Sequence, residues 1–143
     1  MIKVTVWNEY LEELQYEHVA KVYPNGIHEC IREFLEKDPE IQVRCVTLRM
    51  EDQGLSEEIL NDTDVLIWWG HQAHDEVTEE NVQRVKQHVL DGMGLIALHS
   101  AHYSNPMKEL LGTSMCVRWK HGEREKLCLL YTSPSPRDRS LSR

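Results

Sequence analysis

Two short apolar runs constrain the fold of this chain more than any other feature of its sequence. Residues 65–69 read V-L-I-W-W and residues 95–98 read L-I-A-L, with no polar residue in either run. A continuous apolar run of this length is typical of a strand buried on both faces, as in a parallel sheet. A polar, helix-like segment separates the two runs, so we predict two parallel strands joined by a helix.

Strand and helix patterns alternate along the rest of the chain. We predict strands over residues 2–7 and 41–48, helices over 25–37, 56–60, 78–92 and 104–112, and a long loop containing some helix over 11–24. Thr78 is the expected N-cap of the third helix, and Gly92 and Gly112 are expected to end the last two helices. Two more strands are predicted over residues 115–119 and 125–130. This order predicts a doubly wound α/β fold.

The charge of the chain excludes two classes of partner. The 143 residues, enough for one domain, carry 16 Lys and Arg against 24 Asp and Glu, a formal net charge of −8. Nucleic acids and anionic membranes both require clustered Lys and Arg, so we expect neither as a partner. No apolar run approaches the length of a membrane span, and the N-terminus enters a strand without a signal-peptide pattern. We expect a cytoplasmic protein and leave open whether it forms a homo-oligomer.

The four cysteines do not form a recognisable metal or disulfide pattern. Cys30, Cys45, Cys116 and Cys128 show no C-x-x-C spacing, and the first two lie in apolar-periodic segments. We expect reduced, mostly buried thiols.

The end of the chain has a different composition from the rest. Residues 128–138 read C-L-L-Y-T-S-P-S-P-R-D, which resembles the translated transposon adapter found at the ends of truncated metagenomic reading frames. We therefore expect an incomplete domain over residues 1–127, with a sheet truncated at the C-terminus, and an artefactual tail over 128–143. A natural disordered Ser/Pro/Arg tail is the alternative.

Reactive side chains follow three of the predicted strands. Asn8 and Glu9 follow the first strand, and two histidine-rich clusters follow the two apolar runs. The first cluster comprises His71, His74, Asp75 and Glu76, and the second comprises His99, Ser100, His102 and Tyr103. Because ligands bind beyond the carboxyl ends of parallel strands, these side chains predict a pocket there.

Five segments carry a family resemblance: V-T-V-W-N-E-Y, Y-P-N-G-I-H, D-V-L-I-W-W-G-H-Q-A-H-D-E-V, G-M-G-L-I-A-L-H-S-A-H-Y-S and L-L-G-T-S. They are similar to the trehalose-utilisation (ThuA-like) family, and the resemblance covers residues 2–127. It implies a flavodoxin-like three-layer sandwich, similar to the class I glutamine amidotransferases, and a role in the catabolism of disaccharides and other carbohydrates. The expected partner is therefore a small-molecule carbohydrate, and no nucleotide cofactor is expected.

The resemblance does not imply glutamine hydrolysis. In the amidotransferases the nucleophile lies on a sharp turn after a central strand, and Ser100 occupies the matching place. Here serine replaces cysteine, and His99 and Ala101 replace a pair of glycines. We also expect the later part of the domain, where the resemblance would place a His and Glu partner, to be missing from this chain.

The four histidines of the two clusters suggest a metal site. Imidazoles from His71, His74, His99 and His102 are suitable ligands for Zn²⁺ or another divalent transition metal. Three ligands and an open position would provide a Lewis acid or an activated water. The alternative is a pocket in which the same side chains bind sugar hydroxyl groups without a metal.

Other residues at the same edge of the sheet are candidates for catalysis. Ser100 is a candidate nucleophile with His99 or His102 as its base, although we favour the alternative that its hydroxyl caps the following turn. Glu9 and Asp75 are candidate proton-transfer groups.

Four further residues are candidates for contacts with the sugar. Trp7 and Tyr103 are placed to stack on a sugar ring, whereas Asn8 and His28 could reach the same pocket. The alternative for His28 is a solvated side chain. These residues favour a carbohydrate-acting hydrolase, lyase or isomerase. Two alternatives remain open, a non-catalytic sugar-sensing or partner-binding domain and an amidase or peptidase that uses Ser100.

Overall fold

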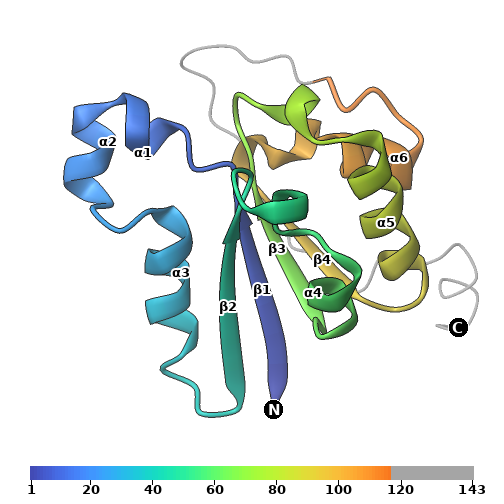
Figure 1. Ribbon diagram of the computed structural model, residues 1–143, viewed down its shortest axis with the longest axis horizontal. Coiled ribbons are helices and arrows are strands. Elements are labelled where there is room, and N and C mark those ends of the chain that lie inside the picture. Colours follow the sequence, from blue (N-terminus) through green and yellow to red (C-terminus); the bar gives the residue numbers. More distant parts are fainter. Residues whose placement is uncertain (117–143) are drawn as a thin grey trace, which may run out of the picture.

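The computed structural model describes residues 1–116 and contains a four-stranded parallel sheet in the order β2-β1-β3-β4 (Figure 1). The strands are β1 (Ile2–Asn8), β2 (Ile41–Thr47), β3 (Val65–Trp69) and β4 (Gly94–Leu98). Both apolar runs form strands, and their pairing is parallel, with Val65 opposite Gly94. The structure confirms the predicted α/β, flavodoxin-like fold.

Helices connect the strands. They are α1 (Glu12–Gln15), α2 (Glu17–Val22), α3 (Ile27–Leu35), α4 (Glu57–Asn61), α5 (Glu79–Leu90) and α6 (Asn105–Leu111). Three short 3₁₀ helices follow the strands: η1 (Glu51–Gly54), η2 (His74–Glu76) and η3 (His99–Tyr103). The loop predicted before α3 therefore contains two short helices, which extend away from the sheet in Figure 1.

The local signals for helix ends are confirmed. The Thr78 hydroxyl accepts a hydrogen bond from the Asn81 amide at 3.4 Å, so it caps α5. Gly112 ends α6 in the left-handed conformation, with φ 63°, which glycine adopts without the steric cost of a Cβ atom.

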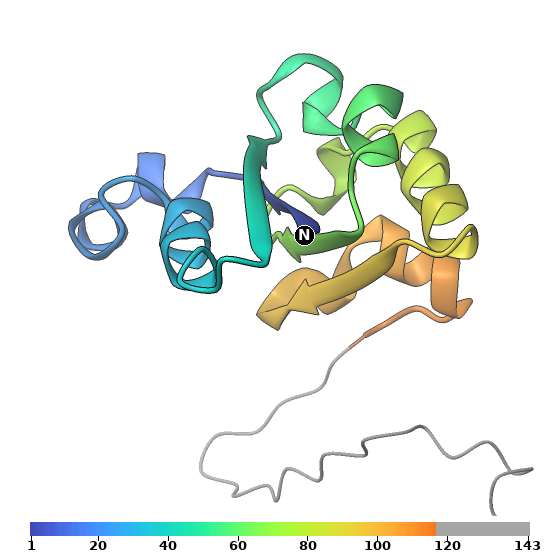
Figure 2. The same ribbon diagram turned by 90° about the horizontal axis from the view of Figure 1, so that it is seen from below.

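The core has one layer on each face of the sheet. Figure 2 shows α3 on one side of β1 and β2, with α4 and α5 on the other side. Val4, Val6 and Ile67 pack toward α3, whereas Trp7 and Trp68 stack on the opposite face with ring centroids 4.0 Å apart. Successive residues of a strand point to opposite faces, which is why β3 is apolar throughout.

Strand β4 is less buried than its sequence predicts. It lies at the edge of the described sheet, and Ile96 is 48% exposed there. Of the strand predicted over residues 115–119, only Met115 and Cys116 are described, and they are not in a strand. The strand predicted over 125–130 and the boundary at 127 lie outside the described residues.

Two of the cysteines are more exposed than the sequence predicts. Cys30 and Cys116 are exposed and unpaired thiols, so the expectation of mostly buried cysteines is wrong for both.

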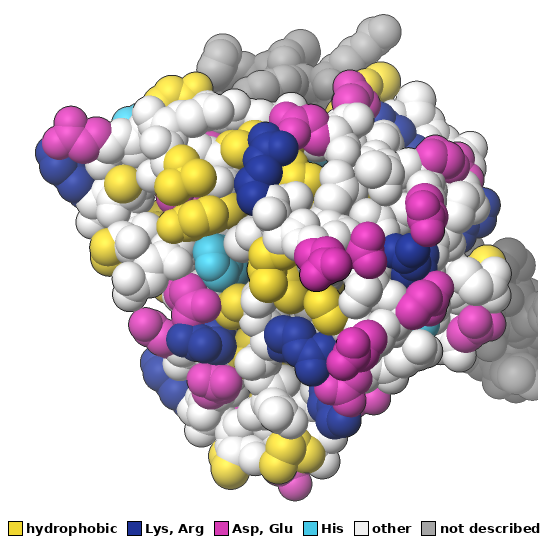
Figure 3. Space-filling model, in the orientation of Figure 1, with side chains coloured by type: hydrophobic (Ala, Val, Ile, Leu, Met, Phe, Trp, Pro, Cys, Tyr) yellow, Lys and Arg dark blue, Asp and Glu magenta, His cyan; other side chains and the backbone are white. Residues whose placement is uncertain are grey.

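On the face seen in Figure 3, Lys and Arg side chains are interspersed with Asp and Glu side chains. Across residues 1–116, every helix is too short or too polar to cross a lipid bilayer.

Candidate functional site

A pocket of about 710 Å³ lies beyond the carboxyl ends of β3 and β4. Its lining residues come from the segments that follow these two strands, and they include both predicted clusters apart from Glu76. They are His71, Gln72, His74, Asp75, His99, Ser100, His102, Tyr103 and Cys116. Of the candidates named from the sequence, seven therefore lie together: His71, His74, Asp75, His99, Ser100, His102 and Tyr103.

Glu9 fixes the segment that carries the first histidine cluster. Its side chain is 1% exposed, and its carboxylate accepts hydrogen bonds from the amides of Gln72 and Ala73, each at 2.9 Å. The Glu9 amide also donates to the carbonyl of Trp69 at 3.1 Å. Glu9 thus joins the end of β1 to the loop after β3, beneath the pocket. Its structural role is to position His71 and His74.

The Ser100 hydroxyl connects the two clusters. Its oxygen lies 2.6 Å from Nδ1 of His71, 3.3 Å from Nδ1 of His99 and 3.0 Å from the carbonyl oxygen of Gly70. Its closest partners are therefore imidazoles and a carbonyl from the neighbouring loop, and the cap interaction favoured from the sequence is not formed. The other ring nitrogen of His71, Nε2, faces Glu12 at 3.8 Å.

His74 is the most enclosed imidazole of the first cluster. Burial lowers its pKa, and the carboxylate of Glu9 opposes this effect. Its ring meets the ring of Tyr103 edge-on at 5.7 Å, and its carbonyl oxygen accepts a hydrogen bond from Asn105. The lowered pKa favours a neutral imidazole near pH 7.

Aromatic side chains flank the second cluster. The ring of His99 stacks on Trp69 at 5.8 Å, and the Lys108 ammonium lies 3.6 Å from the centre of the Tyr103 ring. Neither Trp69 nor Lys108 is among the candidates predicted from the sequence. The position of Trp69 at the last residue of β3 was the available signal, because that end of the strand adjoins the pocket.

Three predicted substrate-binding residues lie outside the pocket lining. Trp7 is 1% exposed, stacks on Trp68, and donates from its indole to the carbonyl of Gln53 at 2.8 Å. Asn8 is also buried, and its side-chain amide contacts Nδ1 of His28 at 2.9 Å. Burial lowers the pKa of His28. These three side chains support the end of β1 from within the fold.

The described side chains are not arranged as a metal site. Within residues 1–116, no three or more His, Cys, Asp or Glu side chains form a group that could hold an ion. Nδ1 of His71 contacts Ser100, and Nδ1 of His102 contacts the carbonyl of His99 at 3.0 Å. In this arrangement the imidazoles of His71, His99 and His102 contact hydroxyl or carbonyl groups, and that of His74 packs against the Tyr103 ring.

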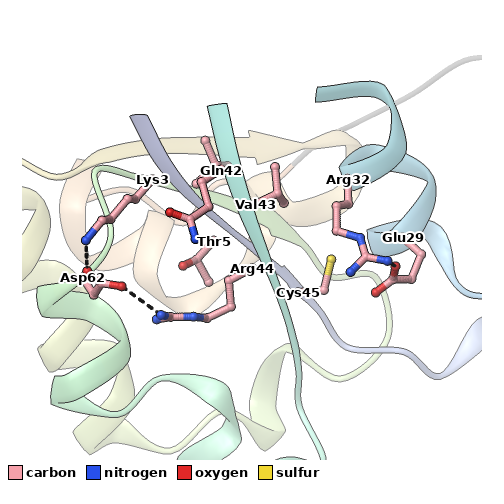
Figure 4. A pocket seen from close by; sticks show the side chains of 10 residues that line it. Lys3, Thr5, Glu29, Arg32, Gln42, Val43, Arg44, Cys45 and Asp62 are labelled. Carbon is pink, nitrogen blue, oxygen red and sulfur yellow. Dashed lines mark hydrogen bonds and ion pairs between the residues drawn. The ribbon is translucent and has the colours of Figure 1, made fainter. Parts of the chain in front are cut away.

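A second cavity, of about 340 Å³, lies around strand β2 (Figure 4). Its charged side chains pair with one another. Asp62 binds both Lys3 and Arg44, the latter at 2.8 Å, and Arg32 pairs with Glu29 on α3. Because these charges already have partners, we do not assign this cavity a ligand.

The comparison with protein families agrees with the family resemblance found in the sequence. A model of the ThuA family, described as trehalose utilisation, matches residues 3–136 and so continues past residue 127. A search of curated proteins gave no match. Because the family model covers nearly the whole sequence, this chain belongs to the ThuA family of trehalose utilisation.

Proposed function

We propose that the pocket beyond β3 and β4 binds a sugar or keto-sugar, and that the protein acts on it in the catabolism of trehalose or a related disaccharide. The observation that carries the proposal is the convergence of four imidazoles, a hydroxyl and a phenol on one cavity of about 710 Å³. This volume falls within the range of about 300–1,000 Å³ that is typical of small-molecule sites.

The lining suits a polyhydroxylated ligand. Imidazole nitrogens and the Tyr103 hydroxyl can both donate and accept hydrogen bonds, and Asp75 adds an acceptor. The exposed Tyr103 ring and the partly buried Trp69 ring offer apolar surface beside these polar groups. A sugar presents both kinds of surface.

Hydrolysis, elimination and isomerisation of sugars all require proton transfer. The neutral imidazole of His74, whose pKa is lowered by burial, is suited to accept a proton near pH 7. Asp75 is the carboxylate that lines the pocket, whereas Glu9 is engaged by backbone amides beneath it. We therefore favour Asp75 over Glu9 as the carboxylate that exchanges protons with the ligand.

The Zn²⁺ or other divalent metal remains a separate prediction. It requires the side chains to rearrange, because within residues 1–116 no three of the His, Cys, Asp and Glu side chains are grouped closely enough to hold an ion. Elemental analysis of the purified protein tests it. About one transition metal per chain, lost in both His71→Ala and His99→Ala, would support a metal site. A metal content that is unchanged in these variants would contradict it.

Isothermal titration calorimetry with trehalose and its keto derivative tests the proposed site. We expect His71→Ala to weaken binding at least about tenfold. His88→Ala is the matched control, because His88 lies on α5 and contacts Glu57 outside the pocket. Absence of binding by the folded wild-type protein to either sugar would contradict the proposal.

A sugar-sensing domain without catalysis is the second candidate. The engagement of Glu9 by the amides of Gln72 and Ala73 favours it, because this removes one of the two carboxylates that could transfer protons. Nuclear magnetic resonance spectra of the sugar incubated with the protein separate the two functions. New product signals would support the enzyme, and binding without product would support the sensor.

A further inference from the structure

His99 adopts a backbone conformation that L-residues rarely adopt. Its φ is +49°, directly after Leu98, which is still extended with φ −97° and ψ 133°. The turn from β4 into η3 is therefore made at His99. The resemblance to the amidotransferases implied a sharp turn at Ser100, one residue later. A left-handed non-glycine residue is strained, and such strain persists only where the surrounding structure enforces it.

The contacts of His99 explain how the turn is held. Its carbonyl oxygen accepts from Nδ1 of His102 at 3.0 Å, and its ring stacks on Trp69 at 5.8 Å with an interplanar angle of 25°. Its Nδ1 lies 3.3 Å from the Ser100 hydroxyl, and its ring centre is 6.2 Å from that of His71. All these partners border or line the same pocket.

The result is an exposed imidazole with one nitrogen directed at Ser100 and one without a hydrogen bond. The ring of His99 is exposed at the pocket wall, and among residues 1–116 its Nε2 has no hydrogen-bond partner. A glycine would make this turn without strain, so the turn alone does not account for the side chain. Backbone strain of this kind clusters at functional sites, where it fixes the position of a reacting group.

We propose that His99 is a catalytic residue that transfers a proton to and from the bound sugar through Nε2. In this step a sugar hydroxyl gives its proton to Nε2, and the oxygen keeps the electron pair of the broken O–H bond. The imidazolium later returns the proton to an oxygen of the product. Ser100, in contact with Nδ1, orients the ring. This inference rests on the proposed sugar site.

Glycine and alanine variants of His99 and His102 test the backbone strain at His99. At His99 we expect the Gly variant to melt a few degrees above the Ala variant, because alanine retains the left-handed strain without the contacts of the imidazole. His102 is the control, since it lies in the same pocket and has a negative φ. There we expect the Ala variant to melt above the Gly variant. The same order at both positions would contradict a strained turn at His99.

Turnover and binding by His99→Gly test the catalytic role. We expect turnover of the sugar to fall at least about 100-fold, as is typical for the loss of a general acid or base, while its dissociation constant changes less than about tenfold. Turnover within about threefold of the wild type would overturn the inference.

The same measurements separate this inference from the proposed function. Binding by the wild-type protein without turnover would overturn the role of His99 and leave the sugar site standing. Absence of binding by the wild-type protein would overturn both.

Discussion

The two cavities of this molecule differ in how their polar groups are partnered. Around β2, Lys3 and Arg44 both form ion pairs with Asp62. Beyond β3 and β4, the lining consists mainly of imidazoles and hydroxyls, and His71 and Ser100 contact each other through a hydrogen bond. Groups that form ion pairs with each other contribute to structure, whereas the hydrogen-bonding groups that line the pocket remain suited to a ligand.

The two cavities also differ in what holds their lining residues in place. The pocket beyond β3 and β4 depends on the buried carboxylate of Glu9, which fixes the loop carrying His71 and His74. The cavity around β2 is bordered by exposed ion pairs. A change in Glu9 should therefore be more damaging than a change in any of the ion pairs.

The largest effect is expected for Glu9→Ala. This change leaves the part-buried amide of Gln72 and the buried amide of Ala73 without their acceptor, and each unsatisfied buried group costs about 1–3 kcal/mol. We expect the free energy of unfolding in urea to fall by about 3 kcal/mol. Glu9→Gln, which keeps one acceptor oxygen, should lose less. Equal unfolding free energies of Glu9→Ala and the wild type would show that Glu9 is no more important for stability than the ion pairs around β2.

A smaller effect, confined to the affinity for the sugar, is expected when one residue in each cavity is changed. His71→Ala should weaken sugar binding at least about tenfold, or about 1.4 kcal/mol, whereas Arg44→Ala should leave it unchanged. Calorimetry of both variants checks this. If Arg44→Ala weakened sugar binding as much as His71→Ala, the cavity around β2 would also take part in binding. The two cavities would then not differ in function.

The stability of the protein should depend on pH through two histidines. Burial lowers the folded-state pKa of both His28 and His74 below the usual 6.5, so the unfolded state binds more protons. The stabilisation is present above pH 6.5 and is lost as the pH falls through the lower folded-state pKa. Urea unfolding at pH 7.5 and pH 5.5 measures the loss.

The histidine variants identify the source of this loss. We expect a smaller difference in stability between the two pH values for His28→Asn and for His74→Asn than for the wild type. An unchanged difference in both variants would assign the pH dependence to other groups.

The smallest effect is expected for Lys3→Met. Its partner Asp62 also binds Arg44, and the side chains of Lys3 and Asp62 are 47% and 41% exposed. Exposed ion pairs contribute little to stability because water and salt screen them. We expect a change in unfolding free energy within experimental error at 0.15 M salt. A clear loss would show that the ion pairs around β2 are structurally important.

The elements of the fold were predictable because their signals are local. The run from Val65 to Trp69 has the length and composition of a buried strand, and Thr78 has the side chain of an N-cap. The clusters at the carboxyl ends of β3 and β4 followed from the same reasoning. Trp7, Asn8 and His28 were placed in the pocket because they are close to a strand end or to the loop in the sequence, but sequence proximity does not give the direction of a side chain.

The sequence by itself determined the order of strands and helices, the family, and the edge of the sheet where the histidines gather. Periodicity and caps act over a few residues, so they can be recognised without a structure. The tertiary structure decided which side chains share the pocket. It placed Trp7 on Trp68 through strand register, Glu9 beneath the loop of Gln72 and Ala73, and the strained turn at His99. These depend on contacts and backbone angles set by packing between segments far apart in the chain.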